Sequence, residues 1–513
     1  MSLRWGAAGH RALLGAAALG TGLAVVALPP ALALALIAGA ALLVAALIEP
    51  MAALMVALSA APLKTLIETE AEAALPLDVG QVAVAGLVLA WFARKAADRG
   101  QIRAPRSPIF AFLLLFMAAA ALSLVNALSL GVGLTELLKW VEIALLAFLT
   151  IDMIASPRAG DSERRQADVR LGWAVLAVLV AGATQAIIGL YEFFGGSGAE
   201  HLAILGGTRY RAFGSFGQPN PFAGFIGVCL ALGAGATWGA LTAWWDARKR
   251  AAESQRAALL RLAVYGALTA PLAAALLASW SRGAWMGVMA ALVAMALFLP
   301  RKRLYGLLLI GAAAALAMLL WASGRLPGAV VERLTDFTDL AAALRDVRGV
   351  DIDDANYAEI ERLAHWQAAV AMATDHPWLG VGFGNYAAAY PTYRLMNWPD
   401  ALGHAHNYYL NLLAETGWAG LGAYLLLWAA VFAMTLRALR RTAGFWRGAA
   451  LGLLGAWTHL AVHSLLDKLY VNNVFLHVGV LLGILAVLCA PGVSSPGQGA
   501  ARASRSSDAN RFY

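Results

Sequence analysis

The stretch of the chain best suited to chemistry is His406-Asn407-Tyr408-Tyr409-Leu410, which opens a long apolar run. After nine residues counted from Asn407 comes Gly417-Trp418-Ala419-Gly420. An imidazole with a pKa of about 6.5 can accept a proton at neutral pH, as the activation of a hydroxyl nucleophile requires. The alternative role for His406 is structural, as a helix N-terminal residue that satisfies a backbone group. The sequence therefore offers His406 as a candidate general base.

Three further polar clusters lie far from this histidine in the sequence. They are Arg209-Tyr210-Arg211-Ala212-Phe213-Gly214 followed by Gln218-Pro219-Asn220-Pro221, then Ser281-Arg282-Gly283, and then His463 with Asp467 and Lys468. An arginine at the end of an apolar run can be a simple interfacial anchor. Arg211 and Arg282 together, on one side of a membrane with a histidine, would instead form a basic pocket suited to a diphosphate.

The composition indicates which kind of secondary structure holds these residues in place. Hydrophobic residues make up 61% of the 513 residues and charged residues 13%, with a mean hydropathy of +0.69. These values exclude an ordinary soluble domain and predict an all-α polytopic membrane protein of twelve to fourteen transmembrane helices. The apolar runs cover 12–28, 31–48, 51–65, 79–93, 108–127, 133–154, 169–192, 219–243, 259–280, 284–299, 303–322, 407–436, 447–466 and 473–490.

Lysine and arginine collect in alternate connections between these runs, which predicts the orientation of the chain. The clusters lie at 94–106, 158–170, 248–261, 301–303 and 437–447. The positive-inside rule makes that side cytoplasmic and turns the 193–218 and 323–405 loops outward. The net charge of +8 then reflects topology, and no nucleic-acid partner is expected.

The predicted organisation has four parts. N-terminal transmembrane helices occupy 1–322, a large periplasmic helical loop 323–405, C-terminal transmembrane helices 406–490, and a disordered cytoplasmic tail 491–513. The first apolar run is interpreted as an uncleaved span, because another run begins at Ala31. Within the large loop we expect an amphipathic helix from Tyr357 to Ala373 and a glycine-rich turn from Gly380 to Asn385, which together could cover the bundle as a lid.

No metal or cofactor is predicted. Asp351-Ile352-Asp353-Asp354 is interpreted as solvated loop charge, and the His459/His463 pair has neither a glutamate after its first histidine nor an evident third ligand. Cys229 and Cys489 both lie inside apolar runs, so we expect neither a disulfide nor a thiolate metal site. The chain has no Walker A motif.

Several of these motifs are similar to those of a known family. His406-Asn407, nine residues and then Gly417-x-x-Gly420 resemble the hallmark of the O-antigen ligase and polymerase superfamily. The resemblance continues in Arg211-x-x-Gly214 with Pro219-Asn220, in Ser281-Arg282-Gly283, and in Trp366 with His376-Pro377-Trp378-Leu379-Gly380-Val381-Gly382. It extends over roughly residues 170 to 490.

The resemblance implies a metal-independent, inverting glycosyltransferase with a GT-C-type helical fold. Members of this superfamily pass a glycan from a polyprenyl (undecaprenyl) diphosphate carrier to an acceptor hydroxyl at the outer face of the inner membrane. Carried onto this chain, His406 is the general base, and Arg211 and Arg282 hold the donor diphosphate. Further candidates for substrate binding or support are Asn220, Tyr393, Arg394, His404, Asn407, Asp467 and Lys468. Asn407 has a second predicted role as a helix cap.

The expected partners are the carrier-linked glycan donor, a glycan acceptor and membrane lipids. A ligase would use lipid A-core as acceptor, whereas a polymerase would use another carrier-linked repeat unit and a protein O-oligosaccharyltransferase a protein. The single large outer loop favours the ligase. A polyprenyl-glycan flippase is the alternative of another class. It would require polar residues along several span centres, where this chain has few: Glu136, Lys139, Glu142, Gln185 and Glu192.

Overall fold

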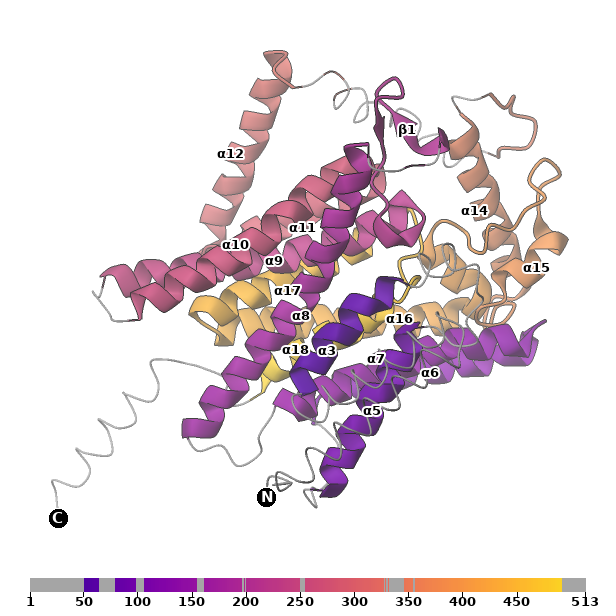
Figure 1. The fold of residues 1–513 in the computed structure, drawn as a ribbon. Helices are drawn as coiled ribbons and strands as arrows, with labels where there is room; N and C mark the ends of the chain where they lie inside the picture. Colours follow the sequence, from indigo (N-terminus) through magenta and orange to yellow (C-terminus); the bar gives the residue numbers. More distant parts are fainter. Residues whose placement is uncertain are drawn as a thin grey trace, which may run out of the picture.

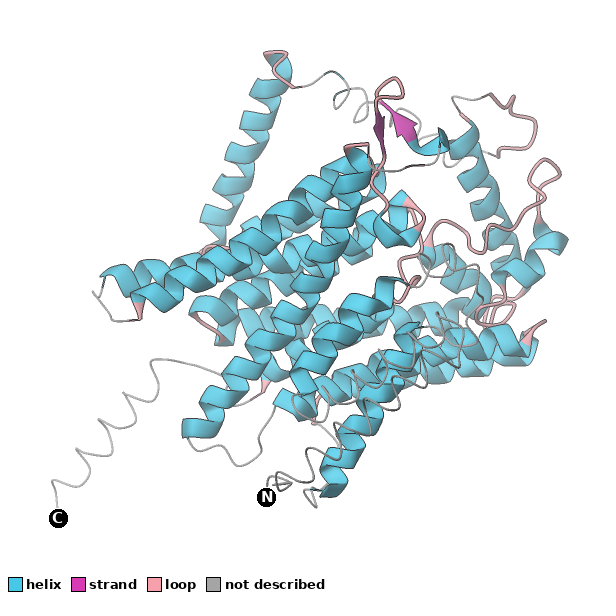
Figure 2. Cartoon of the chain, in the orientation of Figure 1, coloured by secondary structure: helices cyan, strands magenta, loops and turns pink. Residues whose placement is uncertain are grey.

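The computed structural model describes residues 50–63, 79–97, 106–154, 161–195, 198, 200–249, 254–326, 328, 331, 346–353 and 356–490. These residues form a helical bundle (Figures 1 and 2). Its α-helices are α3 (Pro50–Ala60), α5 (Val79–Ala97), α6 (Ile109–Ser123), α7 (Leu130–Ile154), α8 (Asp161–Phe193), α9 (Pro219–Lys249), α10 (Gln255–Ala278), α11 (Arg282–Phe298), α12 (Arg303–Ala322), α14 (Tyr357–Asp375), α15 (Tyr386–Tyr393), α16 (Tyr408–Arg441), α17 (Gly444–His463) and α18 (Val474–Cys489).

Short elements complete the described chain. Four 3₁₀ turns are η1 (Ala61–Leu63), η2 (Leu124–Asn126), η3 (Glu200–Leu202) and η4 (Gly214–Phe216). The two-residue strands β1 (Ala203–Ile204) and β2 (Arg209–Tyr210) pair antiparallel, with Ala203 opposite Tyr210. This hairpin leads the chain from α8 toward Arg211.

The helices confirm the predicted all-α polytopic class. Six described helices are long and apolar enough to cross a membrane, and three shorter apolar helices accompany them. Every predicted apolar run from 51–65 onward coincides with a helix. The runs 12–28 and 31–48, and the tail 491–513, lie outside the described residues. Cys229 and Cys489 are both free.

The core is built from small residues that allow helix backbones to approach closely. Gly235 of α9 lies against Gly448 and Gly452 of α17, so the two backbones are nearly in contact. Gly479 and Gly483 of α18 lie in the same way against α7. Since lipid tails are as apolar as leucine, such packing is a main source of helix association in membranes.

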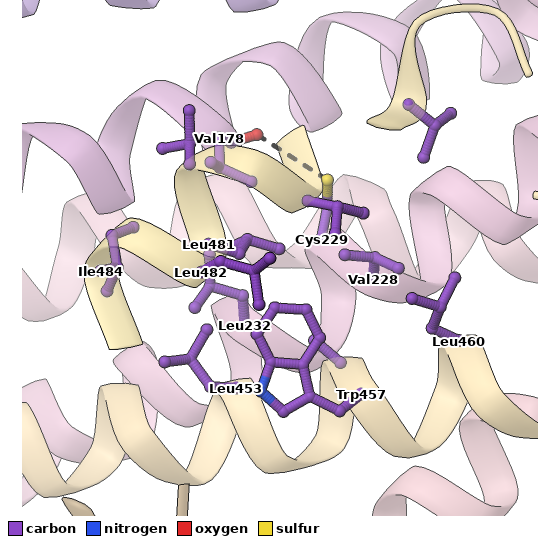
Figure 3. Close-up of a cluster of buried hydrophobic side chains, with 14 of the residues drawn as sticks. Val178, Val228, Cys229, Leu232, Leu453, Trp457, Leu460, Leu481, Leu482 and Ile484 are labelled. Atoms are coloured by element: carbon purple, nitrogen blue, oxygen red, sulfur yellow. Dashed lines mark hydrogen bonds between the residues drawn. The ribbon is translucent and has the colours of Figure 1, made fainter. Parts of the chain in front are cut away.

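Larger side chains fill the space around these contacts. Figure 3 shows Trp457 and Leu453 of α17 among Leu232 of α9 and Leu481 of α18. These four side chains are at most 2% exposed. Cys229 of α9 lies in the same cluster and directs its Sγ toward the Val178 carbonyl of α8, 3.8 Å away. This thiol therefore serves packing.

Basic helix ends gather at one end of the bundle. Lys95, in the last turn of α5, pairs with Asp152 near the end of α7 at 2.8 Å. Arg447 at the start of α17 donates to the carbonyls of Phe298 and Leu299 at the end of α11. These contacts agree with the predicted gathering of lysine and arginine on a single side.

The large loop between α12 and α16, called the outer loop after its predicted orientation, contains the predicted amphipathic helix. The helix α14 begins at Tyr357 and ends at Asp375, close to the expected 357–373. It packs on α16 together with α15, at the side of the bundle in Figure 1. Ala368, Met372, Tyr386 and Ala414 form part of the apolar cluster between them.

A break in α16 joins this loop to the membrane helices. Gly417 has φ +61°, a left-handed conformation inside an otherwise helical segment. The break leaves the carbonyls of Ala414 and Glu415 free to accept hydrogen bonds from Val381 and Gly382, each at 2.9 Å. Because the Trp378 backbone lies directly against Gly417, no side chain fits there. Gly380 and Gly417 therefore allow the loop and α16 to approach closely.

Candidate active site

Arg211 lies beside the Ser281-Arg282 turn, as the diphosphate-pocket hypothesis requires. Its Nε donates to the Ser279 carbonyl at 3.0 Å, and its guanidinium lies 3.4 Å from Oδ1 of Asn220. Ser281 Oγ donates to the same Asn220 oxygen at 2.9 Å. Asn220 thus joins two arginine-bearing segments that are far apart in the sequence.

The backbone that carries Arg211 is held by buried acceptors from α8. One carboxylate oxygen of Glu192 accepts the backbone N–H groups of Phe213 and Gly214, both at 2.8 Å. Gln185 Oε1 accepts the N–H of Ser215 at 3.0 Å. Two of the polar residues in span centres are therefore explained by the positioning of this loop.

Arg282 faces the outer-loop helix α14. Its guanidinium lies 3.5 Å from Oε1 of Glu359. One turn further along α14, Arg362 is close enough to Arg282 for their charges to interact, and it interacts in the same way with Asp467 and His406. Arg362 therefore connects the arginine side of the site with its histidine side.

His406 belongs to a compact group with His404 and Asp467. The rings of His404 and His406 are 4.4 Å apart, and His404 Nε2 lies 3.6 Å from Asp467 Oδ1. The N–H of His406 donates to Nδ1 of His404 at 3.0 Å. Since Nδ1 is the acceptor, neutral His404 carries its proton on Nε2, toward Asp467.

The backbone at His406 is unusual, with φ +52°. Left-handed conformations of residues other than glycine are uncommon and cost about 1–3 kcal/mol when strained. The segment is fixed from both sides, because Tyr408 N–H donates to the Ser464 carbonyl at 2.8 Å and Ala405 N–H to Asn411 Oδ1 at 3.1 Å. The position of the imidazole is thus determined by the surrounding fold.

The environment of His406 favours the neutral imidazole. Burial, with the charge of Arg362 and the neighbouring His365, lowers the pKa of His406 to about 4. Burial, together with His406 and Lys468, lowers the pKa of His404 well below its usual value. Burial also raises the pKa of Asp467 to about 6, against the lowering effects of the Lys468 N–H and Arg362. Nε2 of His406 is buried and makes no hydrogen bond with the described residues.

A buried wall from the outer loop supports the histidine. The ring of His365 on α14 lies 5.6 Å from that of His406 and stacks on Tyr390 of α15 at 4.8 Å. His365 Nδ1 also contacts the Tyr386 hydroxyl at 3.1 Å. The position of the candidate base therefore depends on how α14 packs, because His365 of α14 contacts His406.

Lys468 follows Asp467 and reaches into the bundle. Its ammonium pairs with Glu136 of α7 at 2.9 Å, and Lys139 pairs with the same glutamate at 2.6 Å. Glu415 of α16 is buried near Lys468 and accepts the Tyr386 N–H at 3.1 Å. Lys468 thus joins the candidate site to two membrane helices and, through Glu415, to the outer loop.

Other predicted residues lie elsewhere or have structural contacts. Asn407 caps α16, its side chain accepting from the N–H groups of Tyr409 and Leu410 at 3.1 Å each, which is the structural one of its two predicted roles. Arg394 is exposed at the end of α15, 3.5 Å from the Pro399 carbonyl. Tyr393 lies beside Arg394, where Asp375 accepts from its hydroxyl.

The other possible metal ligands considered in the sequence have different surroundings. Asp351 and Asp353 are exposed, and Asp353 accepts the Asn356 N–H at 2.9 Å. His459 Nε2 is 3.0 Å from the Gly224 carbonyl. Within the described part of the chain, the one group of at least three potential metal ligands comprises His404, His406 and Asp467, whose ligand atoms lie within 4.8 Å of one another. These three could each offer one donor to a cation.

Arg362, like His365, is a residue of the candidate site that was not predicted from the sequence. It lies within the predicted amphipathic stripe, between Ile360 and Leu363, where a basic residue is usually solvated. The sequence feature that could have indicated Arg362 is its spacing from His365. The two residues are three positions apart and so share a face of the helix. Only the packing of α14 on the bundle brings that face to His406.

Part of the chain that contains these residues matches a known protein family. Residues 267–425 match the family model described as O-antigen ligase. The matched segment contains Arg282, Arg362 and His406, and it confirms the resemblance to the O-antigen ligase and polymerase superfamily. Residues 267–425 are thus similar to the O-antigen ligase family, in a chain that is a multi-pass membrane protein. No curated protein matches the chain.

Proposed function

We propose that this protein is a glycosyltransferase that moves a glycan from a polyprenyl diphosphate carrier to an acceptor hydroxyl. The observation that carries the proposal is the placement of Arg362 between Arg282 and the His404–His406–Asp467 group. A basic pocket and a neutral imidazole adjoin there, as transfer from a diphosphate leaving group requires. The family match supports the same class of reaction.

In this mechanism His406 is the general base. Its Nε2 takes the proton of the acceptor hydroxyl while that oxygen attacks the anomeric carbon, and the bond from this carbon to the diphosphate oxygen breaks. The electron pair leaves with the diphosphate. A single displacement of this kind inverts the anomeric configuration.

The arginines stabilise the departing diphosphate. Guanidinium groups form paired, charge-assisted hydrogen bonds with phosphate oxygens and retain their charge at every relevant pH. Arg211 and Arg282 hold the donor in this proposal, and Arg362 adds a third cation from α14. Because α14 also carries His365 against His406, donor binding and base placement depend on one helix.

The polar residues in span centres support an enzyme rather than a flippase. Glu136 pairs with Lys139 and Lys468, Gln185 binds Ser215, and Glu192 holds the Phe213–Gly214 backbone. These groups have structural partners within the described residues, whereas a polar passage would present them to a moving substrate.

We place the reaction at the outer face of the inner membrane, with lipid A-core as the acceptor. The site residues lie at the opposite end of α11 and α16 from the basic ends that the positive-inside rule assigns to the cytoplasm. Polymerase and protein O-oligosaccharyltransferase activities share the same base and clamp. Purified protein offered lipid A-core, carrier-linked glycan and a protein acceptor separately distinguishes the three.

The same transfer assay tests the assigned base. His406→Ala is expected to lower kcat by about 10²–10⁴-fold, because general-base catalysis contributes that range. The control is His201→Ala, which removes an exposed histidine outside the site. Full activity of folded His406→Ala protein would show that another group accepts the proton.

Transfer is proposed to be metal-independent, with the arginines meeting the leaving-group charge. Metal independence can be tested here, because His404, His406 and Asp467 could each offer one ligand atom to a cation. Exhaustive chelation is expected to leave the rate unchanged. Loss of activity on chelation, with recovery on adding one divalent cation, would instead assign these residues to a metal.

A further inference from the structure

A second basic site lies at the end of the bundle opposite the candidate active site. A cavity of about 250 Å³ is lined by Arg301, Arg303, Arg440 and Arg447, with Phe298 and Leu436 among its apolar walls. It lies where α11 ends, α12 begins, and α16 turns into α17. The transfer mechanism uses none of these residues.

The cavity continues into a neighbouring hollow that is also basic. This second space, of about 450 Å³, shares Leu436 and Arg440 with the first and adds Arg437 and Arg441. No acidic side chain lines either space among the described residues. Six guanidinium groups thus surround two adjoining hollows, and their mutual repulsion is relieved when an anion binds.

The arginines that line the first cavity differ in their contacts. Arg447 donates to the carbonyls of Phe298 and Leu299 at 2.8 and 3.0 Å, and Arg303 lies over the Phe298 ring at 4.8 Å. Arg301 and Arg440 are exposed and form no ion pair with the described residues. Their guanidinium groups are therefore available for a phosphate.

The surface beside the cavity is apolar. The helix α12 begins at Arg303, and Leu304, Leu307 and Leu308 are each at least 57% exposed along it. Figure 1 shows α12 standing off from the rest of the bundle. A ligand with its phosphate among the arginines would therefore place any hydrocarbon chains along this helix, which a soluble phosphate would leave uncovered.

We propose that this cavity binds the phosphate headgroup of an anionic phospholipid, with its acyl chains lying along α12. Basic pockets between membrane helices are suited to such headgroups, because guanidinium groups bind phosphate in pairs and the apolar helix surface covers the chains. The lipid would fix α12 against α11 and α16.

The test is lipid retention by the purified full-length chain, measured by native mass spectrometry. The lipids are phosphatidylglycerol and phosphatidylcholine with identical acyl chains. Wild-type protein is expected to retain phosphatidylglycerol preferentially, and Arg303→Gln/Arg440→Gln to weaken this retention by roughly a hundredfold, since each of the two lost charge-assisted hydrogen bonds contributes about tenfold.

The matched control is Arg248→Gln/Arg256→Gln, which removes the same charge from the last turn of α9 and the first turn of α10. It should bind phosphatidylglycerol like the wild type. If Arg303→Gln/Arg440→Gln fails to fold, Arg303→Lys/Arg440→Lys retains the charge and is expected to lose part of the preference.

Three outcomes would overturn the proposal. They are equal retention of both lipids, equal losses in the two double variants, and displacement of phosphatidylglycerol by millimolar inorganic phosphate. The last result would make a soluble anion the ligand. None of these outcomes bears on glycan transfer.

Discussion

At the scale of single residues, the proposed chemistry depends on keeping one imidazole neutral beside several cations. Burial and the charge of Arg362 hold the pKa of His406 at about 4, so its ring is unprotonated at neutral pH. An anionic donor near Arg362 would offset part of this charge and raise the basicity of the ring when the base is needed. In the proposed mechanism, donor binding would therefore strengthen the base.

The acid limb of the pH profile tests this environment. As the pH falls, the Asp467 carboxyl, with its pKa raised to about 6, protonates before His406, whose pKa is lowered to about 4. We expect kcat/KM of the wild type to fall below about pH 6 as Asp467 loses its charge beside His404. In Asp467→Asn the acid limb of the profile should move toward pH 4, because the His406 imidazole is then the group of this pair that titrates.

The control for this profile is the wild type measured in the same buffers and lipids. An acid limb that stays near pH 6 in Asp467→Asn would mean that His406 or another group titrates there, contrary to the assigned environment.

The sequence predicted His406, Arg211 and Arg282 as candidate site residues. Each belongs to a short motif that can be recognised without knowledge of the fold. It also anticipated a supporting role for His404 and Asp467. It could not predict Arg362, because a basic residue on an amphipathic helix has the same local pattern whether it faces solvent or a site. The position of α14 on α16 determines which of these applies.

At the scale of elements, the break in α16 gives a physical reason for the glycine at position 417 of the motif. Glycine is required at 417 because φ is +61° and the Trp378 backbone lies against it. Apolar periodicity predicted the helix itself but not the break, since hydrophobic pattern carries no information on a single left-handed residue.

Gly417→Ala should destabilise the protein and loosen the outer loop. We expect a loss of at least about 1–3 kcal/mol from the strained backbone alone, with a lower Tm and reduced transfer. Gly422→Ala is the control, because Gly422 lies in the same helix with open space around it. Equal Tm values for the two variants would mean that the break does not anchor the loop.

At the scale of the whole molecule, a buried ionic cluster unites parts that are distant in sequence. Lys468 adjoins Asp467, pairs with Glu136 of α7 and interacts electrostatically with Glu415 of α16, which in turn accepts the Tyr386 N–H of the outer loop. From the sequence, Glu136 and Lys139 were polar residues in a span, and only the packing of α7 beside α16 and α18 reveals their partners.

Lys468→Met is expected to destabilise the protein by up to about 3–5 kcal/mol, since it removes one of the two cations beside buried Glu136 and the cation near buried Glu415. Thermal unfolding in detergent measures the effect. The double variant Lys468→Met/Glu136→Gln should recover part of the loss because it removes one of those carboxylates. A Tm for Lys468→Met equal to that of the wild type would show that the cluster adds no net stability.

The most direct test of the central claim is an experimental structure of the chain with a polyprenyl diphosphate glycan bound. We expect the diphosphate to lie within hydrogen-bonding distance of Arg211, Arg282 and Arg362. The anomeric carbon should face Nε2 of His406, with space between them for an acceptor hydroxyl. A diphosphate bound away from these arginines, with His406 too distant to reach the acceptor, would contradict it.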